Sequence, residues 1–447
     1  MICSSPRVVL RAIQPEVASA IRGFRQRQSR RAISSDQDVE VESQLRSLQE
    51  IKAADDLVAR GRRPEAVSLF ERAVDICASS LGTESSITRA AVHRLVQTLY
   101  DDQRFAAAEA VIVSRLTEAK SALPENAAEI LLLSKSQLFQ GKVSTAVESC
   151  LRAVERCEQD DDHTPDTEVL GQMLRQLGAT QMVLGGAEEE AETSLLRAAR
   201  LGASGIDEAK GLSGLASLNA SMGGEQRVEE AVELWREAIA STRTTADPAS
   251  PNTSGEGGVD GNESSSGGVD SGSQDGVTRD LLLCRASVLS SAAQGELLLD
   301  RGTAIASNHL AEALQLREDL LPSRHPAKAW TLALLGRCHL LAGEAVTAEG
   351  LLRAALDALG ALEDSNSAST LVGGQEVVEG VTLYPSPLHS FSKVAALRIY
   401  AELLMQWEKR EAEGRRILKQ AQEVEVGLPL KAPRGLTVHM LHLEDLY

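Results

Sequence analysis

Aromatic residues are scarce in this chain of 447 residues, where Phe, Trp and Tyr together make up 3% of the sequence. Uninterrupted apolar runs are also short, and none approaches the roughly 18 residues that indicate a membrane-spanning helix. The alternating, β-branched pattern of a half-buried strand is rare as well. The 43% apolar content, rich in alanine and leucine, therefore favours an all-α protein with a large helical core.

Sequence motifs of catalysis and cofactor binding are missing too. The chain has no phosphate-binding loop, no dinucleotide fingerprint, no H-E-x-x-H and no G-x-S-x-G. Its six cysteines form no C-x-x-C pair and fall mostly at apolar helical positions, which predicts core residues in a reducing compartment. His439 and His442 lie one helical turn apart, but without a third ligand nearby they predict a docked or frayed end. We therefore expect no catalytic, cofactor-binding or metal-binding residues and no enzymatic activity.

What the chain does contain is an alanine that recurs in a similar context. The intervals from Ala66 to Ala108 and from Ala306 to Ala348 are both 42 residues. Self-similarity at a fixed period of this size indicates a stack of small units, because one unit alone cannot bury its apolar face. Such stacks form binding surfaces far more often than active sites.

The clearest unit spans residues 329–360. Apolar and small residues mark one face of a first helix, Gly343 breaks that helix, and Ala348 and Ala355 mark the face of a second helix. Gly336 is expected to let the two helices approach each other closely. The alanines are expected where a larger side chain would clash.

These units resemble the tetratricopeptide repeat, a helix–turn–helix with small residues where its two helices meet. The matching residues are Ala54, Gly61, Ala66, Phe70 and Ala73; Ser134, Gly141, Ala146, Cys150 and Ala153; Gly178, Ala191, Leu195 and Ala198, with one residue inserted near Gly185; and Ala231, Trp235 and Ala238. A last helix pair at about 390–424 has Ala412 at the matching offset.

The period of 42 residues exceeds the usual period of about 34, and with the segment 325–336 it is similar to the kinesin-light-chain type of repeat. The resemblance covers roughly residues 45–424, apart from two inserts. It implies a right-handed superhelical solenoid of about eight units with two disordered inserts.

The first 35 residues differ from the rest, with seven arginines, no lysine and one acid, Glu16. Their apolar residues recur every three or four positions, which predicts a basic amphipathic helix. This combination is typical of a mitochondrial transit peptide that is cleaved near residue 33. A plastid signal, or a basic surface helix or tail, is the alternative. We expect a mitochondrial protein of the matrix.

Charge bears on the partners. The whole chain carries −18 and residues 1–35 carry +6, so the remainder carries about −24. A body this acidic repels phosphate backbones, which predicts protein partners and no nucleic acid. The charge is equally typical of a protein that is simply highly soluble.

Composition also divides the chain. Residues 241–277 contain no Leu, Ile, Met or aromatic residue, which predicts a flexible linker. The expected organisation is a transit peptide (1–35), an N-terminal repeat array (36–240), a low-complexity linker (241–277), further repeats (278–360), an insert (361–387), C-terminal capping helices (388–424) and a tail (425–447).

The family resemblance also implies candidate binding residues, because the first helix of each unit lines the inner groove of such arrays. The protein-binding residues expected at these positions are His93, Gln97, Tyr100, Lys135, Arg175, Trp330 and Arg337. Tyr100 and Trp330 are expected to be energetic anchors. Ile51 and Asp55 stand where family members that clamp chaperone tails have lysine and asparagine, so we expect no such clamp.

The sequence as a whole favours a non-catalytic adaptor or assembly factor in mitochondria. It is similar to mitochondrial tetratricopeptide proteins of the respiratory complex III assembly type. Two alternatives remain open, namely a cytoplasmic scaffold like a kinesin light chain and an organellar RNA-associated factor. An enzyme with a site assembled across several repeats is a further rival.

Overall fold

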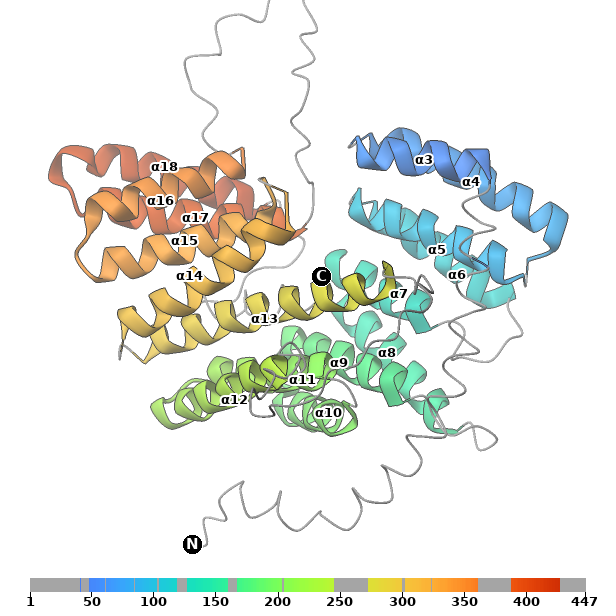
Figure 1. Cartoon of the computed structure of the whole chain (residues 1–447), viewed down its shortest axis with the longest axis horizontal. Coiled ribbons are helices and arrows are strands. Elements are labelled where there is room, and N and C mark those ends of the chain that lie inside the picture. Colours follow the sequence, from blue (N-terminus) through green and yellow to red (C-terminus); the bar gives the residue numbers. More distant parts are fainter. Residues whose placement is uncertain are drawn as a thin grey trace, which may run out of the picture. The chain divides into compact units, whose positions relative to one another are not determined.

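The computed structural model of the chain describes residues 41, 48–60, 62–83, 85–102, 104–118, 127–159, 167–202, 205–244, 272–299, 302–322, 324–360 and 387–426. These residues form sixteen α-helices, α3 to α18, and one short 3-10 helix, η3, with no β-strand among them. The expected all-α class is therefore confirmed (Figure 1).

The chain divides into two compact units, Met1–Thr98 and Leu99–Tyr447. The first unit contains α3 (Gln49–Ala59), α4 (Arg63–Leu81) and most of α5 (Ser86–Asp101), which crosses the boundary. The helices of the second unit are α6 (Phe105–Glu118), α7 (Ala127–Phe139), α8 (Val143–Gln159), α9 (Thr167–Leu184), α10 (Glu188–Leu201), α11 (Gly205–Met222), α12 (Glu225–Thr244), α13 (Gly272–Leu298), α14 (Thr303–Leu320), α15 (Pro326–Leu341), α16 (Ala345–Ala358), α17 (Pro387–Met405), η3 (Glu408–Arg410) and α18 (Glu411–Val426).

In chain order, α3 to α18 make eight consecutive pairs, which agrees with the expected number of about eight units. In the second unit each pair packs as a hairpin, and its second helix also contacts the first helix of the next pair. The first helices α7, α9, α11, α13, α15 and α17 in addition contact one another in succession, and we call them the first-helix row. The helices α15 to α18 show this side-by-side packing plainly in Figure 1.

The recurring alanines lie at the seams between helices. Ala66, Ala108, Ala306 and Ala348 have no exposed surface at all. A Cβ atom added to Gly336 would lie 2.8 Å from Cγ of Leu352, so only glycine permits this approach of α15 to α16. Small residues at these positions therefore serve close helix packing, as expected.

Glycine also shapes the turns between paired helices. Gly141 and Gly343 have φ angles of 75° and 80°, a left-handed conformation that costs other residues energy. The inserted residue expected near Gly185 lies in a turn with two such glycines, Gly185 at 73° and Gly186 at 72°. The extra residue is accommodated there without disturbing the buried contact of Gly178 with Leu195.

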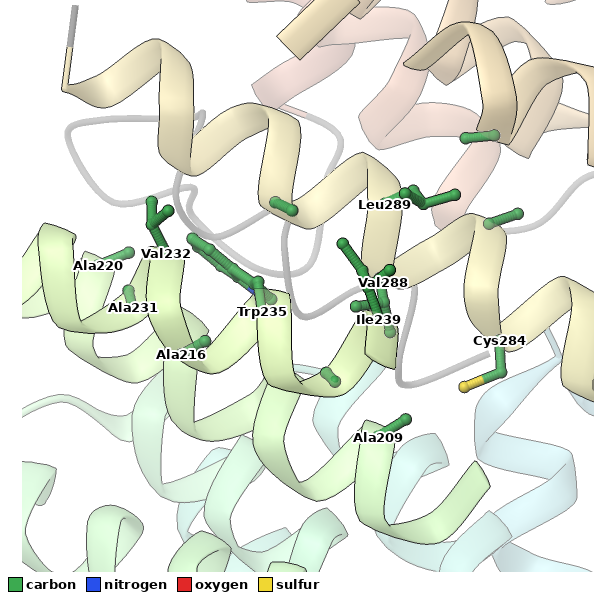
Figure 2. Close-up of a cluster of buried hydrophobic side chains, with 14 residues drawn as sticks. Ala209, Ala216, Ala220, Ala231, Val232, Trp235, Ile239, Cys284, Val288 and Leu289 are labelled. Carbon is green, nitrogen blue, oxygen red and sulfur yellow. The ribbon is translucent and has the colours of Figure 1, made fainter. Parts of the chain in front are cut away.

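A core around Trp235 joins α12 to α13, although 27 residues separate these helices in the chain. Trp235 on α12 is completely buried and lies with Ala216 of α11 and Val288 of α13 in one apolar cluster (Figure 2). Gly295 of α13 packs directly against its ring, because a Cβ atom there would lie 2.1 Å from Cζ3 of Trp235. The stack thus continues from the fifth pair to the sixth through side-chain packing.

The expected register of the last pair is wrong. Ala412 is exposed, and the buried small residue of α18 is Gly414, where a Cβ atom would lie 2.7 Å from Cγ of Met405. The short helix η3 lies between α17 and α18 and moves the packing position by two residues. Ile417 and Ala421 complete the buried face of α18.

The cysteines are core residues in the described part of the chain. Cys77, Cys150, Cys157, Cys284 and Cys338 are all buried and unbonded. Burial raises the pKa of Cys150 to about 12, which keeps its thiol protonated.

Several expected segments lie outside the described residues. These are the transit peptide at 1–35, nearly all of the insert at 361–387, and the tail beyond residue 426. Of the expected linker at 241–277, residues 241–244 belong to α12 and residues 272–277 belong to α13. The organisation into seven segments remains a prediction.

Candidate protein-binding surface

The first-helix row carries five of the seven residues expected to bind a partner or their close neighbours. Lys135 lies on α7, Arg175 on α9, and Trp330 and Arg337 on α15. Tyr100 lies at the end of α5, within the second unit. Lys135, Arg175 and Arg337 are half-buried, so their side chains remain accessible to a partner.

The other two expected residues belong to the first unit. His93 and Gln97 are both half-buried on α5. Near them Arg94 of α5 donates two hydrogen bonds to the carboxylate of Asp55 on α3, at 2.7 and 2.6 Å. This ion pair holds the one acid that the sequence placed on the binding face of the first repeat. Arg94 was not among the expected residues.

Tyr100 and Trp330 are not surface anchors in this structure. Tyr100 is 3% exposed because its ring packs edge-on against Phe105 and Phe139, with ring centroids 5.4 and 5.9 Å apart. Trp330 is 1% exposed, in the buried face of α15. The expectation of aromatic anchors is corrected, because both rings supply core packing where small residues leave space.

Two lysines approach each other on the first-helix row. Lys135 of α7 and Lys210 of α11 are both half-buried and close enough for their charges to interact. Burial, and then the charge of Lys210, lower the pKa of Lys135 to about 8, although Asp101 acts in the opposite direction. We call Lys135 and Lys210 the lysine pair.

The neighbouring acid on α11 is already bound. Arg175 of α9 donates a hydrogen bond of 2.8 Å to the carboxylate of Asp207, and these side chains are only 15% and 12% exposed. Asp207 precedes Lys210 by one helical turn, so it lies on the same side of α11. Arg175, an expected binding residue, therefore acts first as the partner of an acid within the protein.

Sequence reasoning missed Lys210 and Asp207. Both lie in the first turns of α11, a helix whose unit was aligned only through residues of its second helix. The signal that was available is the spacing of Asp207 and Lys210 along one helical face. Their relation to Lys135 and Arg175 arises only when α7, α9 and α11 pack side by side.

The described residues show no sign of a metal centre or a membrane span. They contain no group of three or more His, Cys, Asp and Glu side chains arranged to hold a metal ion. None of the described helices has the length and apolar character needed to cross a bilayer.

These stacked hairpins define a helical-repeat protein. The sequence model of the tetratricopeptide repeat matches residues 53–86, which span most of α3, all of α4 and the start of α5. The chain is thus a tetratricopeptide-repeat protein, and this fold typically serves as a non-catalytic scaffold for protein–protein interaction.

Solved structures with similar repeats are distant. BtubC (BKLC) from P. vanneervenii is 14% identical, with 64% of this chain and 91% of that chain covered and a TM-score of 0.42. Repeats of a putative kinesin light chain from Podosopora anserina are 16% identical, with coverage of 59% and 98% and a TM-score of 0.36. A human IFIT1 dimer with PPP-AAAA is 15% identical, with coverage of 89% and 84% and a TM-score of 0.38. No curated protein matches the sequence.

Proposed function

We propose that this protein is a non-catalytic adaptor or assembly factor that acts in mitochondria and binds partner proteins through its first-helix row. The observation that carries the proposal is the lysine pair, which places charge on an accessible part of a row of packed helices. A stack of this kind offers a long contact surface formed by side chains from several units. Assembly of respiratory complexes is the role that its resemblance to mitochondrial repeat proteins favours.

The mitochondrial assignment rests on residues 1–35, which are rich in arginine and nearly free of acids. Fusing residues 1–40 to a fluorescent reporter tests it. We expect the signal in mitochondria. A diffuse cytosolic signal would instead favour a cytoplasmic scaffold, and a plastid signal would move the protein to that organelle.

The proposal of protein partners, and not nucleic acid, rests on the net charge of −18. Proximity labelling from the full-length chain in intact organelles tests it directly. We expect labelled proteins whose recovery survives RNase treatment. Retention of the purified chain on RNA at physiological salt would overturn this part of the proposal.

A further inference from the structure

Lys135 is a cation without a counter-ion at contact distance. Its ammonium group makes no hydrogen bond and no ion pair with any of the described residues, although the side chain is half-buried. Partial burial removes water from a charged group, and that cost is normally offset by a bound acid or carbonyl. The only favourable charge acting on Lys135 is the more distant Asp101.

Lys210 is in the same situation on the other side of α9. It is half-buried and has no ion pair within the described part of the chain. The two acids beside it are engaged elsewhere, since Asp207 is bound by Arg175 and Glu208 interacts with Glu237 of α12. The lysine pair therefore keeps two positive charges that repel each other.

This arrangement is unusual in a chain whose net charge is −18. Two like charges held together at a protein surface are stabilised when an anion binds between them. The two lysines come from different repeats, and both are accessible. An anionic group that lay across α9 would contact both ammonium groups at once.

We infer that the lysine pair receives an acidic segment of a partner protein, with neighbouring Asp or Glu side chains bound to Lys135 and Lys210. The inference rests on the proposed adaptor function and adds the chemistry of the partner. Carboxylates form charge-assisted hydrogen bonds with ammonium groups. An acidic side-chain cluster supplies two such groups at the spacing of adjacent residues, whereas the acidic remainder of the chain repels a long phosphate backbone.

The test uses the full-length chain and three labelled probes in fluorescence anisotropy. The probes are a Glu-rich peptide, the same peptide with Gln in place of Glu, and a single-stranded RNA of equal charge. We expect only the Glu-rich peptide to bind, and its affinity to fall as salt rises. Tighter binding of the RNA would overturn the inference in favour of a nucleic-acid ligand.

Substitutions locate the site. The double variant Lys135→Gln/Lys210→Gln should weaken binding of the Glu-rich peptide by about tenfold or more, because it removes both charges. A matched control, Lys52→Gln/Lys419→Gln, removes two exposed charges elsewhere and should leave affinity unchanged. Equal affinity of wild type and the lysine-pair variant would sink the inference.

Stability without a ligand gives an independent readout. If Lys135 has no counter-ion, Lys135→Met should raise the thermal midpoint of the free chain, since an uncompensated charge is replaced by an apolar side chain of similar length. A lower midpoint would mean that the charge is already neutralised, which contradicts the inference. If proximity labelling finds the same RNase-resistant partners for wild type and the lysine-pair variant, the adaptor function stands and only the lysine-pair site fails.

Discussion

Replacing Gly295 by alanine tests how the fifth helix pair is joined to the sixth. The new Cβ atom would lie 2.1 Å from Cζ3 of Trp235 and 2.8 Å from Cε3 of the same ring. Carbon atoms in contact normally stay about 3.5–4.0 Å apart, so the ring must move by more than about 1 Å. Trp235 is completely buried, and every direction of movement meets packed side chains.

The magnitude follows from two opposing terms. Overpacking of a well-packed core costs about 1–3 kcal/mol, while the change from glycine to alanine within a helix gains about 1 kcal/mol. We therefore expect Gly295→Ala to destabilise the chain by about 1–2 kcal/mol, and by more if the seam between α12 and α13 opens. Gly350→Ala is the matched control, because no atom lies within 4 Å of its added Cβ and only the helical gain remains.

Urea unfolding followed by circular dichroism measures both variants, and hydrogen exchange of α12 and α13 shows whether the loss is local. Trp235→Phe should relieve part of the clash, so the double variant with Gly295→Ala should lose less stability than the sum of the two single variants. If Gly295→Ala proved as stable as Gly350→Ala, the close packing of Trp235 on Gly295 would be refuted.

Three further predictions concern packing and pH. Ala348→Leu should cost about 1–3 kcal/mol in urea unfolding, since Ala348 is completely buried, whereas Val346→Leu at a site 83% exposed should change little. Gly414→Ala should destabilise the last pair while Ala412→Ser does not, and the reverse order of thermal midpoints would restore the register expected from the sequence. Burial, then the charges of two neighbouring cations, lower the pKa of His325 from 6.5 to about 4. Its contribution to stability, at most about 3 kcal/mol, is therefore present above pH 6.5 and lost as the pH falls towards 4, and His325→Asn should remove that part of the pH dependence in acid unfolding curves.

Much of the fold could be predicted because its seams demand small residues. The interval of 42 residues between buried alanines repeats, and glycines with positive φ mark the turns between the helices. At the last pair the same reasoning failed by two residues, because η3 inserts a turn that no residue type announces. Ala412 and Gly414 are both small, so only packing against Met405 distinguishes them.

The binding surface was predicted less well. Lys135 and Arg175 were expected on accessible positions and are half-buried there. Tyr100 and Trp330 were expected at equivalent positions, yet both are buried. A helical position specifies a direction from its own axis, but whether a side chain reaches solvent depends on the neighbouring helices and on how much space their small residues leave.

By itself the amino-acid sequence determined the class of protein, since a period of small and apolar residues is stable only as stacked helix pairs. The tertiary structure decided where charge is concentrated. Lys135 and Lys210 are 75 residues apart, and only the packing of α7, α9 and α11 brings their charges together. Periodicity is a local property that a sequence displays directly, whereas the electrostatics of a surface depend on distances between side chains that no single repeat contains.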